Sequence, residues 1–298
     1  MSEIGRVAIV GFGEVGQILA ADLQSAGVKQ VAVWDIAFSD PASLPSLALA
    51  KCSVASAESA EGAARGAHLV ISAVTAANCL AAARAVAPGL APDAFFLDLN
   101  SSSPNVKLMA SNAIELARGR YVEAAVMSPI APRGIASPML LGGPHAKDFL
   151  TAAARVGFAG ARHYSEEIGS AAATKLCRSV VIKGLEALLT EALIAARHYD
   201  VADEVLASLS NLLPLPDWKE TAHYMISRAV EHGVRRAEEM REAARTVEEA
   251  GLEPLMSRAV AERQDWAGAR HAALAPDLNA LLASLTLQDR SHPEMSRP

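Results

Sequence analysis

Residues 11–16 read Gly11-Phe12-Gly13-Glu14-Val15-Gly16, and they follow directly on the apolar run Val7–Val10. A β-branched run, a G-x-G-x-x-G turn and an amphipathic stretch in this order are typical of a dinucleotide-binding loop. The first glycine permits the tight turn, the second lets the backbone approach a pyrophosphate, and the third lets the helix pack closely on the strand. The helix N-terminus then offers free N–H groups to the anion. We therefore predict that residues 11–16 bind a dinucleotide; the alternative is that the glycines only turn the chain.

An acidic residue, Asp35, ends the next apolar run, Val31–Trp34, at the distance expected for a ribose-binding carboxylate. A carboxylate at this place accepts hydrogen bonds from both ribose hydroxyls of an adenosine. A 2′-phosphate would meet the same negative charge, and the residues that follow supply no Arg or Lys to compensate: Ile36, Ala37 and Phe38. We therefore expect the cofactor to be NAD, although NADP stays open.

The first half of the chain, from Arg6 to about Tyr164, alternates short apolar runs with Ala-rich amphipathic stretches. This alternation is typical of βα units that build a largely parallel sheet with helices on both faces. The predicted strands are Val7–Val10, Val31–Trp34, His68–Ala73, Phe95–Asp98, Tyr121–Val126 and Met139–Leu141. The predicted helices between them are about Val15–Ala26, Ser59–Arg65, Asn78–Val86, Val106–Ala117 and Ala146–Val156.

The second half of the chain lacks the alternation, and its pattern is helical. No proline interrupts the stretch from about Ile168 to His198, so it predicts one long helix. A second helix is predicted from Trp218 to about Ala250, with the breaker and cap residues 213–217 before it and Gly251 after it. We therefore expect a dinucleotide-binding domain at 1–166, a helical substrate and dimerisation domain at 167–286, and a flexible tail at 287–298.

Composition and charge exclude several classes of protein. Of the 298 residues, 51% are hydrophobic but only 4% are aromatic, which favours an aliphatic, helix-rich core over an all-β fold. The formal net charge is -6, so neither a nucleic acid nor an anionic membrane is an expected partner. The first apolar run is short and ends at Gly11, unlike a secretion signal or a membrane span, so we expect a cytoplasmic protein.

Three cysteines, Cys52, Cys79 and Cys177, show no C-x-x-C spacing and have no nearby His in a metal-ligand pattern. We expect all three to be small buried apolar residues. No metal site is expected.

A polar turn follows the predicted strand Phe95–Asp98 and reads Asp98-Leu99-Asn100-Ser101-Ser102-Ser103-Pro104. Together with the glycine loop and two later segments, it resembles the β-hydroxyacid dehydrogenase superfamily, which includes 6-phosphogluconate and 3-hydroxyisobutyrate dehydrogenases. The resemblance implies that Asn100 and Ser101 lie near the nicotinamide ribose, and we place Val74 and Thr75 among the cofactor-binding residues as well. Taken alone, the same turn is also an ordinary helix N-cap.

The substrate loop of this family, D-A-P-V-S-G-G, is matched loosely by the sequence E-A-A-V-M-S-P at 123–129. The resemblance implies that Ser128 holds a substrate carboxylate. Pro129 replaces the first glycine of the motif and lacks an N–H group, so the carboxylate must be bound differently. Arg133 is either a compensating cation or a solvated loop residue.

Residues 168–179 resemble the family's G-x-G-x-x-x-K-x-x-x-N entrance to the interdomain helix, and Lys175 matches the catalytic lysine. The resemblance implies that Lys175 is a general acid and base, a role that desolvation of its ammonium favours. Ser179 stands at the Asn position and shares a helix face with Lys183, so both are candidate contacts for an acidic substrate. Ile182 replaces the glutamate of true 6-phosphogluconate dehydrogenases, so we do not expect decarboxylation of that sugar phosphate.

The resemblance as a whole implies an α/β Rossmann N-terminal domain plus an all-α C-terminal domain, joined by a long interdomain helix. The C-terminal half resembles a poorly characterised, 6-phosphogluconate dehydrogenase-like domain, in which His232, Arg235 and Arg236 are either substrate contacts or surface residues. The apolar helices beyond Glu166 predict a homodimer.

The implied activity is that of an NAD(P)-dependent dehydrogenase or reductase acting on a small 3-hydroxy acid or a related carbonyl compound. Two alternatives stay open. One is an imine reductase, a related group that generally lacks the lysine. The other is a catalytically silent dinucleotide-binding redox sensor, which Pro129 and Ser179 favour.

Overall fold

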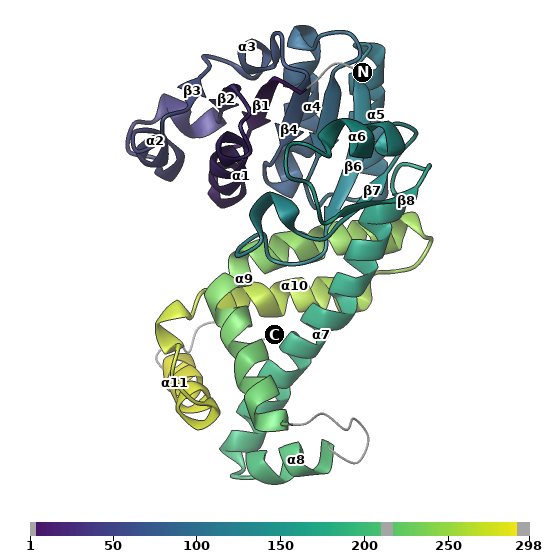
Figure 1. The fold of residues 1–298 in the computed structure, drawn as a ribbon. Helices are drawn as coiled ribbons and strands as arrows, with labels where there is room; N and C mark the ends of the chain where they lie inside the picture. The colour runs from purple at the N-terminus through teal and green to yellow at the C-terminus, as the bar shows by residue number, and fades with distance from the viewer. Residues whose placement is uncertain (1–3, 210–216, 291–298) are drawn as a thin grey trace. The chain divides into compact units, whose positions relative to one another are not determined.

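The computed structural model describes residues 4–209 and 217–290, and the chain divides into two compact units, Met1–Lys175 and Leu176–Pro298. The first unit is α/β and the second is all-α, joined by one long helix, as predicted (Figure 1). The division falls at Lys175 rather than at the expected residue 166. The reason is that the first turn of the long helix is hydrogen-bonded to the sheet of the first unit.

The first unit is built on an eight-stranded sheet with the order β3-β2-β1-β4-β5-β6-β7-β8. Its strands are β1 (Arg6–Val10), β2 (Gln30–Trp34), β3 (Ala55–Ser56), β4 (Leu69–Ser72), β5 (Phe95–Asp98), β6 (Arg120–Val126), β7 (Met139–Gly142) and β8 (Ala161–Ser165). Within this sheet β6 and β7 pair antiparallel, and the other neighbours pair parallel. The loops that follow β1, β2, β4 and β5 therefore leave the same edge of the sheet.

The six predicted strands are confirmed, whereas β3 and β8 were not predicted. β3 has only two residues, both exposed, and β8 reads A-R-H-Y-S with no buried residue. Both strands lie at the edges of the sheet, where pairing with one neighbour does not require an apolar pattern.

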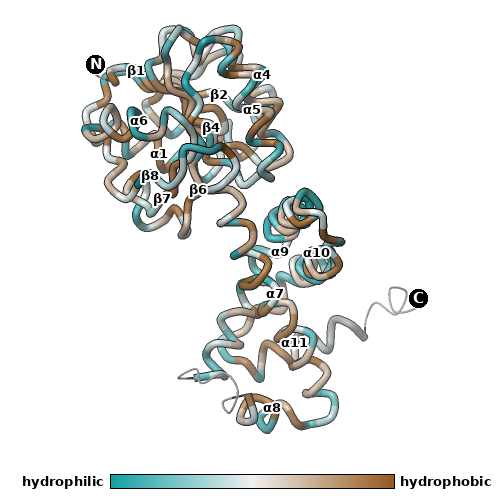
Figure 2. The backbone as a smooth tube through the Cα atoms, turned by 90° about the vertical axis from the view of Figure 1, so that its right-hand side faces the viewer, coloured by the Kyte–Doolittle hydropathy of each residue, from teal (hydrophilic) through white to brown (hydrophobic). Residues whose placement is uncertain are grey.

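Helices cover both faces of the sheet because successive strand residues point to opposite sides. Val7 and Ile9 of β1 belong to one apolar core, whereas Ala8 and Val10 belong to the other. The helices of this unit are α1 (Glu14–Ser25), α2 (Leu44–Leu49), α3 (Ala60–Ala64), α4 (Cys79–Val86), α5 (Pro104–Leu116) and α6 (Ala146–Ala153). The first core holds α1 and α6, the second holds α3, α4 and α5, and Figure 2 shows hydrophobic segments gathered along the central strands between them.

The second unit consists of α-helices and one short 3-10 turn in its described residues. Its helices are the long α7 (Ser170–His198), which starts in the first unit, and α8 (Ala202–Leu209), α9 (Trp218–Glu249), α10 (Leu255–Gly268) and α11 (Leu278–Arg290). Leu193 of α7, Ile226 of α9 and Leu281 of α11 are fully buried in one apolar cluster. The core of this unit therefore joins helices that are far apart in the sequence.

The two long helices of the second half are confirmed. Asp217 caps α9, since its carboxylate accepts the N–H of Glu220 at 2.9 Å. The rest of the predicted breaker, 213–216, lies outside the described residues. The predicted tail begins too early, because α11 continues to Arg290, and residues 291–298 also lie outside the described residues.

The expectation of three buried cysteines is wrong for two of them. Cys79 is buried, but Cys52 and Cys177 are exposed. Cys52 lies in the turn after α2, and Cys177 lies on α7. None of the helices in residues 4–209 and 217–290 combines the length and the hydrophobicity that crossing a bilayer requires.

Candidate cofactor and active site

The glycine loop connects β1 to α1, and two of its glycines are required by the fold. Gly11 has a φ of +96°, and a Cβ there would lie 2.3 Å from the carbonyl oxygen of Ala73. A Cβ on Gly16 would lie 2.0 Å from the carbonyl oxygen of Gly11. These two positions exclude any side chain, because the turn and the helix pack against backbone.

Gly13 is different, because a Cβ built on it meets nothing within 4 Å among the described residues. Its φ of -72° suits any residue, so the backbone conformation does not require glycine there. Gly13 is the N-cap of α1 and has no side chain to accept the free N–H groups of the first turn. The loop thus leaves open space at a helix N-terminus, which fits the pyrophosphate of a dinucleotide.

We expect Gly13→Ala to weaken NAD binding by about 10- to 100-fold, the equivalent of about 1–3 kcal/mol of steric conflict with the pyrophosphate. Calorimetric titration of the purified variant with NAD measures the change. Gly5→Ala is the matched control, because a Cβ there makes only an ordinary contact of 3.9 Å with His68 before β1 begins. Equal NAD affinity in both variants would contradict the assignment of the loop.

Asp35 lies at the end of β2, beside the glycine loop, and its carboxylate is fixed by two backbone groups. Its Oδ2 accepts the N–H of Phe12 at 2.6 Å, and its Oδ1 accepts the N–H of Ala37 at 2.8 Å. An ionised carboxylate has about four acceptor positions, so two stay available for ribose hydroxyls. The structure therefore brings Asp35 and the glycine loop together as the sequence predicts.

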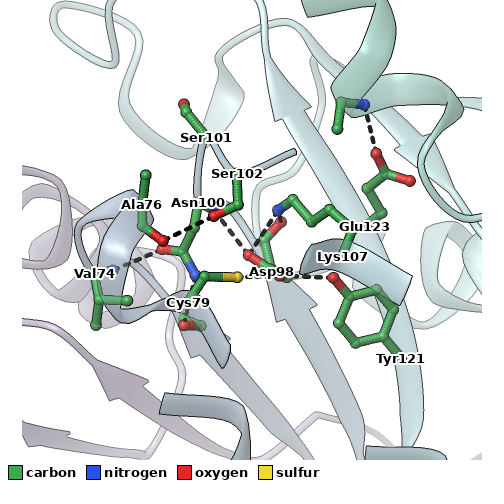
Figure 3. Close-up of polar contacts among 12 residues, drawn as sticks. Val74, Ala76, Cys79, Asp98, Asn100, Ser101, Ser102, Lys107, Tyr121 and Glu123 are labelled. Carbon is green, nitrogen blue, oxygen red and sulfur yellow. Dashed lines mark hydrogen bonds and ion pairs between the residues drawn. The ribbon is translucent and has the colours of Figure 1, made fainter. Parts of the chain in front are cut away.

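Asn100 ties the loop after β4 to the loop after β5 (Figure 3). Its Oδ1 accepts the N–H of Val74 at 2.7 Å, and its Nδ2 donates to Ser72 Oγ at 2.9 Å. Thr75 continues the first loop and accepts a hydrogen bond from Asn78 at 3.0 Å. The Asn100 amide is therefore engaged with protein groups, and the neighbouring Ser101 side chain points away from this network.

Lys175 and Ser101, which are 74 residues apart, meet at this edge of the sheet. The ammonium Nζ of Lys175 donates to Ser101 Oγ at 2.7 Å. Lys175 belongs to the second turn of α7, and Ser101 follows β5. The structure therefore places in hydrogen-bond contact two residues that the sequence identified in separate motifs, the turn 98–104 and the segment 168–179.

Glu123 is a fully buried acid on β6 that the sequence did not identify as a site residue. Its two carboxylate oxygens accept the N–H groups of Gly169 at 2.6 Å and Ala172 at 2.5 Å, at the start of α7. Burial raises the pKa of Glu123, while the Lys107 ammonium and these two N–H groups oppose that rise. Two signals in the sequence point to Glu123: it is an acid inside the otherwise apolar run Y-V-E-A-A-V, and it stands at the acid position of the family's substrate loop.

A second buried cluster surrounds Asp98, at the end of β5 (Figure 3). Lys107 Nζ lies 2.8 Å from Asp98 Oδ1, while Tyr121 OH and Cys79 Sγ donate to Oδ2 at 2.6 Å and 3.2 Å. Burial and the neighbouring Asp98 raise the pKa of Cys79 to about 12, so its thiol stays protonated at physiological pH. The cluster supports the loop that carries Ser101, and the sequence did not predict it.

The predicted substrate serine, Ser128, lies in the loop after β6. Its hydroxyl donates to the Pro129 carbonyl at 3.1 Å. The loop is anchored further along, where the N–H of Ile135 donates to Asp22 of α1 at 2.7 Å. Arg133 of the same loop is exposed.

Two cations proposed as substrate contacts have carboxylate partners inside the helical unit. Lys183 pairs with Glu239 of α9, and the Lys183 side chain is 9% exposed. Arg236 pairs with Glu186, which is itself buried. Ser179 is half-buried on α7. Ion pairs between α7 and α9 therefore engage Lys183, the predicted substrate contact, and Arg236, for which the sequence left a substrate contact and a surface role open.

Comparison with known proteins agrees with the division into two units. Residues 6–147 match the family model described as the NAD binding domain of 6-phosphogluconate dehydrogenase, and residues 196–267 match a domain of unknown function, DUF1932. No curated protein sequence matches the chain significantly.

Solved structures resemble the chain over nearly its whole length. A conserved hypothetical protein from Sinorhizobium meliloti 1021 is 35% identical, with 96% of this chain and 97% of that one covered and a TM-score of 0.76. The conserved protein MTH1747, described as similar in structure to 3-hydroxyacid dehydrogenases, is 31% identical, with 88% and 96% covered and a TM-score of 0.69.

A more distant structure shares the fold. Mycobacterium tuberculosis 3-hydroxyisobutyrate dehydrogenase, solved with L-serine, is 19% identical, with 96% of this chain and 99% of that one covered and a TM-score of 0.72. With the glycine loop, the two matched domains and these relatives, the chain belongs to the β-hydroxyacid dehydrogenase superfamily, and its first unit is a nicotinamide-dinucleotide-binding domain.

Proposed function

We propose that the protein is an NAD-preferring dehydrogenase or reductase that interconverts a small 3-hydroxy acid and its carbonyl counterpart, with Lys175 as general acid and base. The observation that carries the proposal is the hydrogen bond of 2.7 Å from Lys175 Nζ to Ser101 Oγ. Ser101 follows β5, at the same sheet edge as the glycine loop after β1. A proton-transferring group and a dinucleotide loop at one edge are what hydride transfer from a hydroxyl carbon needs.

In this proposal the glycine loop holds the pyrophosphate and Asp35 holds the adenosine ribose. When bound, the nicotinamide supplies the hydride acceptor for oxidation or the hydride donor for reduction. Lys175 takes the hydroxyl proton as its neutral amine while the carbonyl forms, and in the reverse direction its ammonium returns that proton to the carbonyl oxygen. Ser101 accepts a hydrogen bond from the ammonium and so holds Nζ in place.

The proposal assigns an acidic substrate to hydroxyl and ammonium groups that the sequence singled out. The Ser128 and Ser179 hydroxyls can donate hydrogen bonds to a carboxylate, and Lys183 is a cation. Lys183 would have to exchange Glu239 for the substrate. The homodimer expected from the helical domain stays a prediction.

A screen of the purified protein with NAD and NADP tests the proposal. The panel contains 3-hydroxy acids, their carbonyl counterparts and cyclic imines, and the absorbance of the reduced nicotinamide reports turnover. Turnover of a hydroxy acid supports the proposal. Reduction of imines alone would favour an imine reductase, which Lys175 argues against, and cofactor binding without any turnover would favour a redox sensor.

We expect kcat/KM to be at least about tenfold higher with NAD than with NADP, since the Asp35 carboxylate would repel a 2′-phosphate and about 1.4 kcal/mol suffices for that ratio. Asp35→Ser removes the charge and should narrow the preference. Asp40→Ser, at a nearby acid that accepts the N–H of Ala42, should keep it. A strong preference of the wild-type protein for NADP would overturn the assignment.

A further inference from the structure

Glu123 occupies a strand position that an apolar residue would normally fill. The residues beside it on β6, Val122 and Ala124, are buried in the sheet domain, and Glu123 is itself 0% exposed. A buried carboxylate is costly unless its oxygens are hydrogen-bonded. Both oxygens of Glu123 have such partners, and both partners are backbone N–H groups from one place, the start of α7.

The first turn of a helix has N–H groups without intrahelical acceptors. The backbone bond from Ala173 to Gly169 begins the ladder of α7, so the N–H groups of Gly169 and Ala172 lie before it. Glu123 accepts both, and its negative charge faces the positive end of the helix dipole. Figure 3 shows the carboxylate directed at this N-terminus.

The neighbouring strand leaves room for this arrangement. Gly142 of β7 pairs with Glu123, and a Cβ on Gly142 would lie only 2.8 Å from Glu123 Oε2. On the other side, Lys107 of α5 and Asp98 of β5 are the charged groups that act on Glu123. Gly142 therefore leaves room for the carboxylate, and the Lys107 ammonium is the nearby charge that favours its ionised form.

Lys175 lies less than one helical turn beyond Ala172, so a helix start that is fixed on β6 also fixes the Cα of Lys175. The Lys175 ammonium then reaches Ser101, whose loop is supported by the cluster around Asp98. One connected set of buried groups thus places both ends of the Lys175–Ser101 hydrogen bond. Mispositioning of a reacting group by about 1 Å can cost about 100-fold in rate.

We propose that Glu123 is a positioning residue for the reaction, whose carboxylate clamps the first turn of α7 so that Lys175 Nζ stays on Ser101. The inference rests on the proposed function for its kinetic test, because only then is Lys175 the proton-transferring group. The structural part of the inference, in which Glu123 holds the Lys175 ammonium in position, does not depend on any substrate.

The variants Glu123→Gln and Glu123→Asp separate a clamp from a packing role. The Gln side chain keeps the volume but turns an NH₂ group toward an N–H, whereas Asp keeps the charge and loses one methylene. A clamp predicts that E123Q loses about 10- to 100-fold in kcat, with the affinity for NAD unchanged, and that E123D recovers part of the loss. A packing role predicts the opposite order, with E123D the more damaged variant.

A second measurement needs neither substrate nor cofactor. The protein is labelled briefly with an acetylating reagent, and mass spectrometry gives the rate at Lys175 relative to the exposed Lys147 as reference. The rate at Lys175 should rise several-fold in E123Q and less in E123D, because its bond to Ser101 loosens. The control is Asp217→Asn, at an acid that accepts the N–H of Glu220 at the start of α9, and it should leave the rate unchanged.

Wild-type labelling rates in both variants would overturn the inference, even if the protein proves to be a hydroxyacid dehydrogenase. A changed labelling rate in a protein that turns over no substrate would support the clamp and count against the proposed function instead. If circular dichroism shows that E123Q does not fold, the labelling rate at Lys175 in E123D is the test. An unchanged rate in E123D overturns the inference.

Discussion

Lys175→Met is expected to lower kcat by about 10²- to 10⁴-fold, the usual contribution of a positioned general acid or base. Met keeps the length and the apolar stem of the side chain but cannot carry a proton or donate to Ser101. The affinity for NAD should change little, because the glycine loop and Asp35 lie on other elements of the unit. Steady-state kinetics on a substrate found for the wild-type protein, together with NAD titration, measures both quantities.

Lys147→Met provides the control, since Lys147 is 65% exposed and pairs with Glu166 at the surface of the same unit. It should leave kcat unchanged. Near-normal turnover of the Lys175 variant would remove Lys175 from the mechanism. The assignment of the glycine loop to dinucleotide binding would not be affected.

Lys107→Met is expected to destabilise the first unit by about 3–5 kcal/mol, because removal of one member of a buried ion pair leaves the other charge uncompensated. Lys107 is 1% exposed and Asp98 is 0% exposed, so water cannot replace the lost ammonium. Chemical denaturation followed by circular dichroism measures the free energy of unfolding. Lys219→Met, at an exposed lysine that pairs with Asp203, should leave the unfolding transition almost unchanged.

The pH dependence of this pair has a defined sign. Burial lowers the pKa of Lys107, but Asp98 and the other nearby anions outweigh it and raise the pKa above its ordinary value of 10.5. The stabilisation by Lys107 is therefore complete below 10.5 and is lost as the pH rises through the higher folded pKa. The difference in stability between the wild-type protein and the Lys107 variant should therefore shrink as the pH rises above 10.5, and an equal difference at every pH would contradict the ion-pair explanation.

Local patterns predicted most of the scaffold. The glycine loop, the six main strands and the long helices α7 and α9 all depend on short-range periodicity, turn residues and caps, which the chain displays directly. The sequence did not predict the strands β3 and β8, because edge strands show little apolar pattern.

The contacts among the buried polar groups could not be predicted for another reason. Asp98, Lys107 and Tyr121 come from β5, α5 and β6, and their meeting depends on the pairing of those strands and the docking of the helix. The pattern within one helix likewise failed to show that Lys183 faces Glu239, because a shared face does not reveal which helix covers it. Tertiary partners of this kind cannot be deduced from spacing alone.

The contact boundary directly after Lys175 has a consequence for recombination. The cofactor loop, Ser101, Glu123 and the lysine all belong to residues 4–175, so a crossover at 176 inherits them together from one parent. Exchange of the helical half between relatives would vary what the helices recognise without separating Lys175 from Ser101 and Glu123. The boundary at which relatives could exchange domains therefore lies inside the helix α7 and not in a linker.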